Sequence, residues 1–462
     1  MTAKAAASPW AVFGLTAIAV FLVSVDGTIV LAAFPALRDE FAATSPARLS
    51  WVLNGYTIVY AALLVPAGRW ADTTGRRRVF LAGLALFGLA SALCGLAATP
   101  AWLVAARVVQ AAGAAMLTPA SLALILAAFP AARRAVAVSL WGAVGALAAA
   151  VGPAVGGWLV DLAGWRAVFL VNLPIVLIAL WRARVRLLES RSPEPAAAPD
   201  WLGIALLIGG VGAIVLGIVE ADHLALGEAA GISTAGLALL LGFVAWARGR
   251  PGAALDLSLF AEPSYGWVNA ASLVFGAAFT MMFLGFFLYL TAIWHYSLTQ
   301  AGLAVTPGPL AVIPVAILGG RLAGRMGHRP LLVAGGVLFA LSQLWFLLAL
   351  DATPDFLRHW LPRMLLGGAS VGLVLPALGA AAAARLGPRS FGAGNAANAA
   401  FRQVGSAFGA AGVVLLAGHA EAGLAEFDTV FKLLIVGGLL TALLCLPVDT
   451  RPRGSARGEA GA

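Results

Sequence analysis

The chain has 462 residues, of which 61% are hydrophobic and only 11% are charged, and its formal net charge is +9. Soluble domains carry roughly 25% charged residues, so this composition excludes a water-soluble globular protein. A positive net charge can indicate nucleic-acid binding, but here the arginines lie in short segments between long apolar runs, and no nucleic-acid partner is expected.

A helix needs about 20 apolar residues to cross the hydrocarbon core of a bilayer. The apolar runs of this chain are continuous and lack the alternation of membrane β-strands. The sequence therefore predicts an all-α integral membrane protein in contact with the lipid bilayer. Fourteen transmembrane helices are expected, over residues 10–33, 49–68, 79–98, 101–129, 135–160, 165–183, 201–220, 231–247, 266–290, 301–320, 330–350, 358–382, 395–418 and 429–447.

The distribution of charge predicts the orientation. If the N-terminus is cytoplasmic and each helix changes side, most of the 29 basic residues fall on the cytoplasmic side and acidic residues gather in the outer loops. This is the positive-inside pattern, so both termini are predicted to be cytoplasmic and the protein to be a multi-pass protein of the inner membrane. The first run is longer than the apolar core of a signal peptide, so we expect it to be a true helix.

The first helix contains Asp26, the only carboxylate well inside any of the fourteen runs. A charge at the centre of a membrane helix costs about 2.5–3.5 kcal/mol on insertion scales, which suggests that it is used. Burial favours the protonated carboxyl and a nearby arginine favours the ionised one, so Asp26 is a candidate for proton exchange. The alternative is a hydrogen-bond acceptor that fixes helix packing.

The second and third runs are separated by a segment that begins at Gly68 and continues through Asp72 and Gly75 to three arginines. The two glycines are expected to let the backbone turn tightly at the membrane surface. Asp72 can accept hydrogen bonds from helix N-terminal amides or from arginines, which would latch two helices together. A positively charged anchor at the cytoplasmic surface is the simpler alternative.

The fourth run carries Arg107, about six residues from its outer end and therefore about 9 Å deep. Asp26 lies about eight residues from the outer end of the first run, at about 11 Å. These similar depths make a direct ion pair geometrically feasible. The alternative is an arginine whose side chain extends outward to the membrane surface.

The fifth run contains Gly145, Gly152, Pro153, Gly156 and Gly157 in the pattern G-x6-GP-x2-GG. Small residues allow membrane helices to approach closely. Proline removes one backbone hydrogen bond and bends the helix. This run is therefore predicted to pack closely against its neighbours.

A proline-rich segment at 191–199 precedes two further apolar runs, and a weak repeat relates the chain before it to the chain after them. Gly68 and Gly75 recur as Gly320 and Gly327, and Arg107 recurs as Arg363. The repeat predicts two halves of six helices with an inserted two-helix hairpin. The expected domains are an N-terminal bundle, a linker with the hairpin, and a C-terminal bundle with a cytoplasmic tail, over residues 1–190, 191–250 and 251–462.

Two later runs contain candidate substrate-binding residues. The ninth is rich in phenylalanine and methionine, including Phe283 and Phe287, which can line an adaptable apolar pocket or face lipid. In the thirteenth, Asn395, Asn398 and Arg402 share one helical face, which lines a cavity or joins two helices.

These segments resemble motifs A, B and C of the major facilitator superfamily of transporters, and fourteen helices resemble its drug:proton antiporter branch. The sequence departs from the family pattern at Ala111, where motif B has glycine, and at Gly324, where the repeat of Asp72 is lost. The resemblance implies proton coupling by Asp26 and Arg107. It implies gating by Gly68, Asp72, Gly75, Arg76, Arg77, Gly152, Pro153 and Gly156. The candidate cavity residues are Thr28, Asn54, Gln110, Phe283, Phe287, Asn395, Asn398 and Arg402.

The resemblance predicts a monomeric, proton-coupled multidrug efflux antiporter that contributes to antibiotic resistance. It would export lipophilic compounds, cations among them, by alternating access. The alternative is a dedicated exporter of one endogenous metabolite, antibiotic or lipid. No phosphate-binding loop, metal-ligand cluster or catalytic set is evident, so no cofactor, metal or enzymatic activity is expected.

Overall fold

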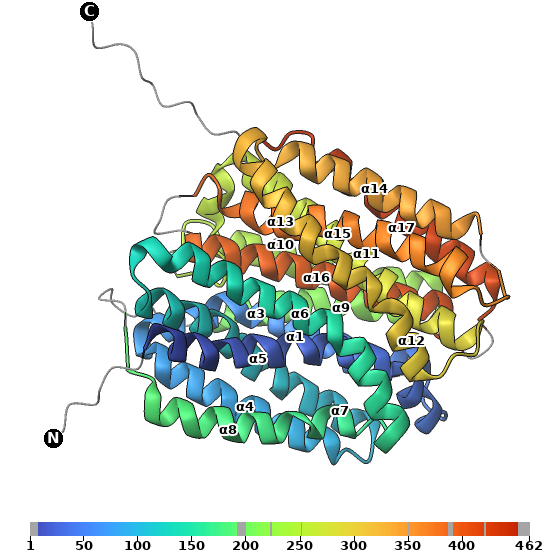
Figure 1. The fold of residues 1–462 in the computed structure, drawn as a ribbon, viewed down its shortest axis with the longest axis horizontal. Coiled ribbons are helices and arrows are strands. Elements are labelled where there is room, and N and C mark those ends of the chain that lie inside the picture. Colours follow the sequence, from blue (N-terminus) through green and yellow to red (C-terminus); the bar gives the residue numbers. More distant parts are fainter. Residues whose placement is uncertain are drawn as a thin grey trace, which may run out of the picture.

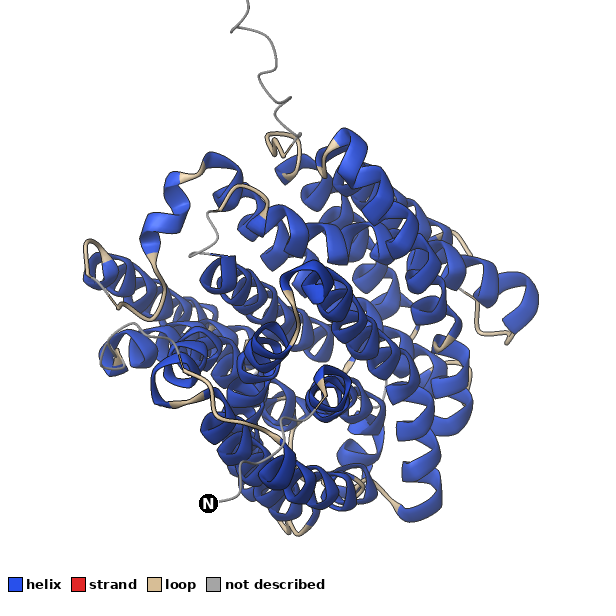
Figure 2. Cartoon of the chain, turned by 60° about the vertical axis from the view of Figure 1, so that its left-hand side comes forward, coloured by secondary structure: helices blue, strands red, loops and turns tan. Residues whose placement is uncertain are grey.

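The computed structural model describes residues 8–191, 200–221, 224–250, 252–349, 351–386, 391–419 and 422–450. All regular elements in these ranges are helices, and Figure 2 draws no strand. Most of the predicted proline-rich linker, residues 192–199, lies outside the described residues, as does the predicted cytoplasmic tail at 451–462.

The first half of the chain forms six membrane-spanning segments, two of which are each divided into a short and a long helix. They are α1 (Pro9–Glu40), α2 (Pro46–Leu49), α3 (Trp51–Thr74), α4 (Arg76–Gly95), α5 (Pro100–Ala128), α6 (Ala131–Ala163), α7 (Ala167–Leu170) and α8 (Asn172–Arg186).

A hairpin and six further segments follow. The hairpin consists of α9 (Trp201–Val219) and α10 (Leu226–Ala247). The second half contains η1 (Leu257–Ala261), α11 (Pro263–Ala292), α12 (Leu298–Val305), α13 (Pro307–Met326), α14 (Arg329–Leu347), η2 (Phe356–Trp360), α15 (Leu361–Ala383), α16 (Phe391–Ala417) and α17 (Leu424–Leu444).

Fourteen segments within the described residues are long and apolar enough to cross a membrane, which confirms the expected number. Their bounds agree with the predicted runs to within about five residues, with three exceptions. Helix α1 continues through Pro35 to Glu40, α3 continues to Thr74, and α13 continues to Met326. Membrane helices tolerate internal proline because neighbouring groups satisfy the freed backbone.

The helices form two bundles joined along a seam, which confirms the predicted all-α membrane fold with two six-helix repeats (Figure 1). Helices α1 to α8 pack together, and α11 to α17 pack together. The seam consists of α3 against α16, α6 against α12 and α13, and α1 against α11. The hairpin places α9 against both α3 and α16, while α10 packs mainly on α9. The exact domain boundaries stay a prediction.

The surface of the bundle is apolar, as expected of helices that face lipid rather than water. Trp181 is 68% exposed and Leu348 is 77% exposed. Below, the end of the bundle that contains Gly75 and Arg76–Arg78 is called the basic end. The end that contains Asp161 and Ser297 is called the opposite end.

Candidate functional site

A buried ion pair joins α1 to α5 in the first half. Arg107 Nη1 lies 2.5 Å from Asp26 Oδ2, and neither residue is more than 1% exposed. Gln110, one turn after Arg107, donates from Nε2 to Asp26 Oδ1 at 2.9 Å. Both carboxylate oxygens of Asp26 therefore have a partner, and the contact that the similar depths allowed is present.

The arginine is held from several sides. Its Nη1 also donates to Gln110 Oε1 at 2.7 Å, and its Nε donates to the Val52 carbonyl of α3 at 3.2 Å. The guanidinium carbon lies 4.0 Å from the ring centroid of Tyr56. Gln110 donates in addition to Ser91 Oγ of α4 at 2.9 Å. A buried ion pair needs such extra hydrogen bonds to offset its desolvation, so α1, α3, α4 and α5 share one network.

The glycines of α6 allow close contacts with two different helices. A Cβ on Gly156 would lie 2.7 Å from Ile29 Cγ1, and one on Gly152 would collide with the Thr28 hydroxyl, so these two positions face α1. A Cβ on Gly157 would collide with the Leu298 carbonyl of α12 in the other half. In return, a Cβ on Gly302 would lie 2.5 Å from the Pro153 carbonyl. The glycine pattern thus fixes α6 within its own half and against the other half.

A polar contact reinforces this seam at the opposite end. Asp161, near the end of α6, accepts a hydrogen bond from the Thr299 backbone N–H at 2.9 Å. Thr299 lies in the first turn of α12, where backbone donors are free and the helix dipole favours negative charge. The Asp161 carboxylate therefore links the two halves at the opposite end.

At the basic end, the structure corrects the expected loop. Helix α3 continues through Asp72 to Thr74, and the chain turns at Gly75, whose φ is +128°. Gly68 is not a turn residue; it lies within α3, where a Cβ would be 3.3 Å from Pro119 of α5. Gly68 therefore serves helix packing, and only Gly75 serves the turn.

The recorded polar contacts of the segment from Asp72 to Arg78 stay within the first half. Asp72 pairs with Arg76 at 2.7 Å, one turn later. The carboxylate of Glu189 accepts the backbone N–H groups of Arg77 and Arg78 at the start of α4, at 3.0 and 3.2 Å. Arg77 Nη2 donates to the Arg184 carbonyl at the end of α8 at 2.8 Å. These contacts join α3, α4 and α8 at the basic end.

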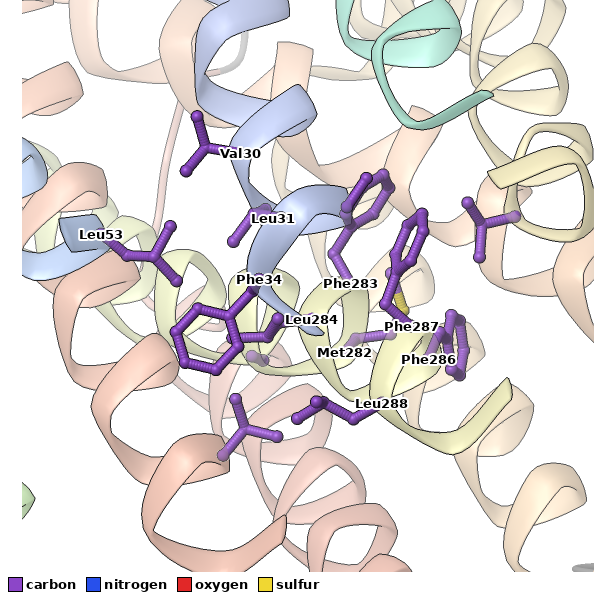
Figure 3. Close-up of a cluster of buried hydrophobic side chains, with 14 of the residues drawn as sticks. Val30, Leu31, Phe34, Leu53, Met282, Phe283, Leu284, Phe286, Phe287 and Leu288 are labelled. Atoms are coloured by element: carbon purple, nitrogen blue, oxygen red, sulfur yellow. The ribbon is translucent and has the colours of Figure 1, made fainter. Parts of the chain in front are cut away.

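A cavity of about 100 Å³ lies between the two halves. Its wall includes Thr28 of α1, together with Phe279, Met282, Phe283 and Phe286 of α11. Figure 3 shows Met282, Phe283, Phe286 and Phe287 on α11 beside Leu31 and Phe34 of α1. From the sequence, the phenylalanine and methionine side chains of α11 could either line a pocket or face lipid. The structure places Phe279, Met282, Phe283 and Phe286 at the cavity.

Among the other candidate cavity residues, several are engaged elsewhere. Phe287 and Asn54 are fully buried outside the cavity wall, and Gln110 belongs to the ion-pair network. Asn398 donates to Asn269 Oδ1 and Ser272 Oγ of α11 at 3.1 and 2.7 Å, so it joins two helices. Asn395 and Arg402 are partly exposed on α16 and do not line the described cavity.

Sequence reasoning missed five residues of this site: Tyr56 and Ser91 of the ion-pair network, Glu189, Asp161, and Arg363, which lines the cavity. Glu189 and Asp161 act through backbone N–H groups of distant helices, so the sequence gives no local signal for their partners. Arg363 had a signal, because the internal repeat matches it to Arg107.

Within the described residues, no group of three or more His, Cys, Asp or Glu side chains is placed to hold an ion.

The model of the Major Facilitator Superfamily matches residues 16–267 and 268–462. A cephamycin export protein of Amycolatopsis lactamdurans is 35% identical over 87% of this chain and 84% of its own length. A drug efflux pump, JefA, of Mycobacterium tuberculosis is 36% identical over 70% of this chain and 64% of its own length.

Solved structures show the same fold. A bacterial homolog of the human lysosomal transporter Spinster, in an inward-facing and occupied conformation, superposes with a TM-score of 0.67. The alignment covers 96% of this chain and 98% of that one at 15% identity, so the likeness concerns the fold alone.

Proposed function

The chain belongs to the major facilitator superfamily and is a multi-pass membrane transporter rather than an enzyme, and from this premise we propose that it is a proton-coupled antiporter. It exports lipophilic compounds by alternating access. We further propose that it works as a monomer in the inner membrane with both termini cytoplasmic, as the distribution of arginine predicts.

The observation that carries the proposal is the network of Asp26, Arg107 and Gln110. An ionisable group inside a membrane protein marks an ion or proton pathway by default. Asp26 is the only carboxylate deep in any described span, and in this conformation it is fully buried. Protonation of Asp26 would remove the negative charge that holds Arg107 and would loosen α1 from α5. A proton can in this way change how the helices of the first half pack.

The seam supports alternating access. The halves are linked at the opposite end by Asp161 and by close contact of α6 with α12. At the basic end, Asp72 pairs within its own half. In the proposed orientation the basic end is cytoplasmic, so the opposite end faces outward. An exporter must release its substrate at the outer side, so the link between α6 and α12 at the opposite end must open during the cycle. A contact made of one hydrogen bond and glycine packing would supply the two-state element that such rocking requires.

A dedicated exporter is the second candidate. Relatives of the chain include a protein named for the export of one antibiotic, cephamycin, as well as a drug efflux pump. Cavity side chains decide between a narrow and a broad substrate range. A panel of structurally unrelated lipophilic compounds separates the two, because a dedicated exporter would transport only one chemical type.

The test uses the purified protein in liposomes that contain a pH-sensitive dye and an acidic lumen. We expect each transported compound to accelerate proton release from wild type. Asp26→Asn should abolish this substrate-dependent release, since the side-chain amide does not ionise and therefore cannot bind and release the transported proton. Asp39→Asn, a change of the same kind on the exposed end of α1, is the matched control and should behave as wild type.

Proton release that persists unchanged in Asp26→Asn would refute the assignment of the proton to Asp26. Transport without any proton release in wild type would refute antiport itself.

A further inference from the structure

The two repeats carry equivalent arginines with different partners. Arg363 lies seven residues after Phe356 at the start of its span, as Arg107 lies seven residues after Pro100. Arg107 is neutralised by Asp26 of α1. Helix α11, the first of the second half, contains no Asp or Glu, so the second repeat has no acid in the place of Asp26.

Within the described residues Arg363 is buried without an ion-pair partner. It is 5% exposed, and its Nε has no hydrogen-bond partner there. The carboxylate of Asp355 accepts the Arg358 backbone N–H at 3.0 Å; it attracts Arg363 from a distance but forms no direct ion pair with it among the described atoms. The rings of Trp345 and Phe346 lie 5.6 and 5.7 Å from its guanidinium carbon. Such cation–π contacts are too weak to offset the desolvation of a buried charge.

A second polar group beside the cavity is also incompletely paired. Gln343 of α14 donates from Nε2 to the sulfur of Met282 at 3.5 Å, and its Oε1 has no partner among the described residues. Thioether sulfur is a weak acceptor. Met282 itself lines the cavity, so a ligand that displaces Met282 would meet the amide donor of Gln343.

We propose that this cavity binds an amphiphilic organic anion, a carboxylate attached to an aromatic ring system. The carboxylate pairs with Arg363, whose planar fork matches it in two hydrogen bonds. The ring system lies against Phe279, Phe283 and Phe286 of α11. This inference rests on the proposed export function and names its substrate class.

The same residues disfavour a lipophilic cation, which the sequence had included among the substrates. The described cavity wall contains Arg363 and no Asp or Glu. Asp26, the carboxylate that could attract a cation, is fully buried against Arg107. A cation would therefore meet the unpaired positive charge of Arg363 at low effective dielectric.

The experiment measures binding rather than transport, so its outcome does not depend on proton coupling. Three probes share one ring system: anthracene-9-carboxylate, the neutral anthracene-9-carboxamide and the cationic 9-(aminomethyl)anthracene. Their binding to the purified full chain in a non-ionic detergent is followed by quenching of tryptophan fluorescence. We expect the carboxylate to bind at least about tenfold more tightly than the amide, because a hydrogen bond to a charged group is stronger than one between neutral groups. The cation should bind more weakly than the amide.

The variants assign the effect to Arg363. Arg363→Gln should reduce the preference for carboxylate over amide to about twofold or less and leave amide binding unchanged, which shows that the cavity is intact. Arg363→Lys should retain part of the preference. Arg358→Gln removes an exposed arginine from the same end of the protein and should change nothing. If Arg363→Gln does not fold, Met282→Asp provides the missing acid and should abolish the preference.

Equal binding of the three probes to wild type would overturn the proposal, as would an unchanged preference in Arg363→Gln. Displacement of the bound carboxylate by phosphatidylglycerol, but not by soluble aromatic carboxylates, would show a lipid site and would also overturn it. Failure of the export assay with intact carboxylate binding would refute the transport function alone.

Discussion

At the scale of single residues, the two buried arginines differ in what their removal should do to stability. Breaking a buried ion pair by removing one partner costs about 3–5 kcal/mol, because the remaining charge is left unpaired. Arg107 has such a partner in Asp26, and Arg363 has none among the described residues. The two positions are therefore expected to respond in opposite ways.

We predict that Arg107→Gln lowers the midpoint of thermal unfolding in detergent, and that Asp26→Asn added to it restores part of the loss. Arg363→Gln should leave the midpoint unchanged or raise it, since it removes a buried cation that has no ion pair in the described structure. The measurement is a double-mutant cycle on Asp26 and Arg107, with Arg363→Gln as the comparison. Additive losses at Asp26 and Arg107 would show that the pair is not coupled.

The sequence identified the two partners of the buried ion pair, but not the side chains that surround it. Asp26 and Arg107 could be matched by depth because helix rise is fixed, so two residues in separate runs can be compared without a structure. The amide of Gln110 and the ring of Tyr56 complete the network, and neither could be assigned, because sequence does not give the rotation of one helix against another.

At the scale of helices, the fourteen spans follow from the length of apolar runs, whereas their exact ends depend on contacts between helices. Helix α3 extends to Thr74 and the turn is reduced to Gly75. The carboxylate of Glu189, more than a hundred residues later, occupies the start of α4. The glycine pattern in α6 predicted close packing but could not tell which glycine faces α1 and which faces α12.

The glycines of α6 give a prediction that separates these two faces. Gly157→Ala should push α6 away from α12, because the added Cβ collides with a backbone carbonyl that no side-chain rotation relieves. Overpacking of this kind costs about 1–3 kcal/mol, which shifts the equilibrium between closed and open seams by roughly fivefold to somewhat over a hundredfold. Gly142→Ala in the same helix has no atom within 4 Å of the new Cβ and is the control.

The distance between α6 and α12 can be measured by electron spin resonance between spin labels attached at Trp158→Cys and Leu303→Cys. Both sites are exposed, on α6 and α12, and the native Cys94 and Cys445 are buried. We expect Gly157→Ala to populate longer distances and Gly142→Ala to match wild type. An unchanged distribution in Gly157→Ala would show that the α6–α12 contact does not control the opening of the seam.

At the scale of the whole molecule, the inserted hairpin fastens both halves at the basic end. Asp200, which precedes α9, accepts hydrogen bonds from Trp246 Nε1 of α10 and from the Ala254 backbone N–H, each at 2.9 Å. Arg69 of α3 donates to the adjacent Ala253 carbonyl at 2.5 Å. The first half, the hairpin and the chain that enters the second half therefore meet at one carboxylate and its neighbours.

This junction gives a prediction about pH. Burial disfavours the charge of Asp200, but hydrogen bonds from Trp246, Gly203 and Ala254 outweigh it, so the pKa of Asp200 lies below its ordinary value of 3.8. A depressed carboxyl pKa stabilises the fold at pH values above the unfolded pKa, and this stabilisation is lost as the pH falls through the folded value. The hydrogen bonds of Asp200 should therefore stabilise the junction equally at pH 7 and pH 5. Their contribution should decrease only below about pH 4.

Asp200→Asn should reproduce the acid effect at pH 7. An amide accepts hydrogen bonds without charge, and the difference between charged and neutral acceptors amounts to about 1 kcal/mol, so α10 should exchange its amide hydrogens roughly fivefold faster. Hydrogen exchange read by mass spectrometry on residues 227–250 measures this. Asp256→Asn is the control, because Asp256 accepts only the nearby Ser258 N–H among its recorded hydrogen bonds. Helix α10 packs mainly on α9, so unchanged exchange in Asp200→Asn would mean that apolar packing on α9 alone holds the hairpin in place. The two halves would then move relative to each other without any restraint from the hydrogen bonds of Asp200.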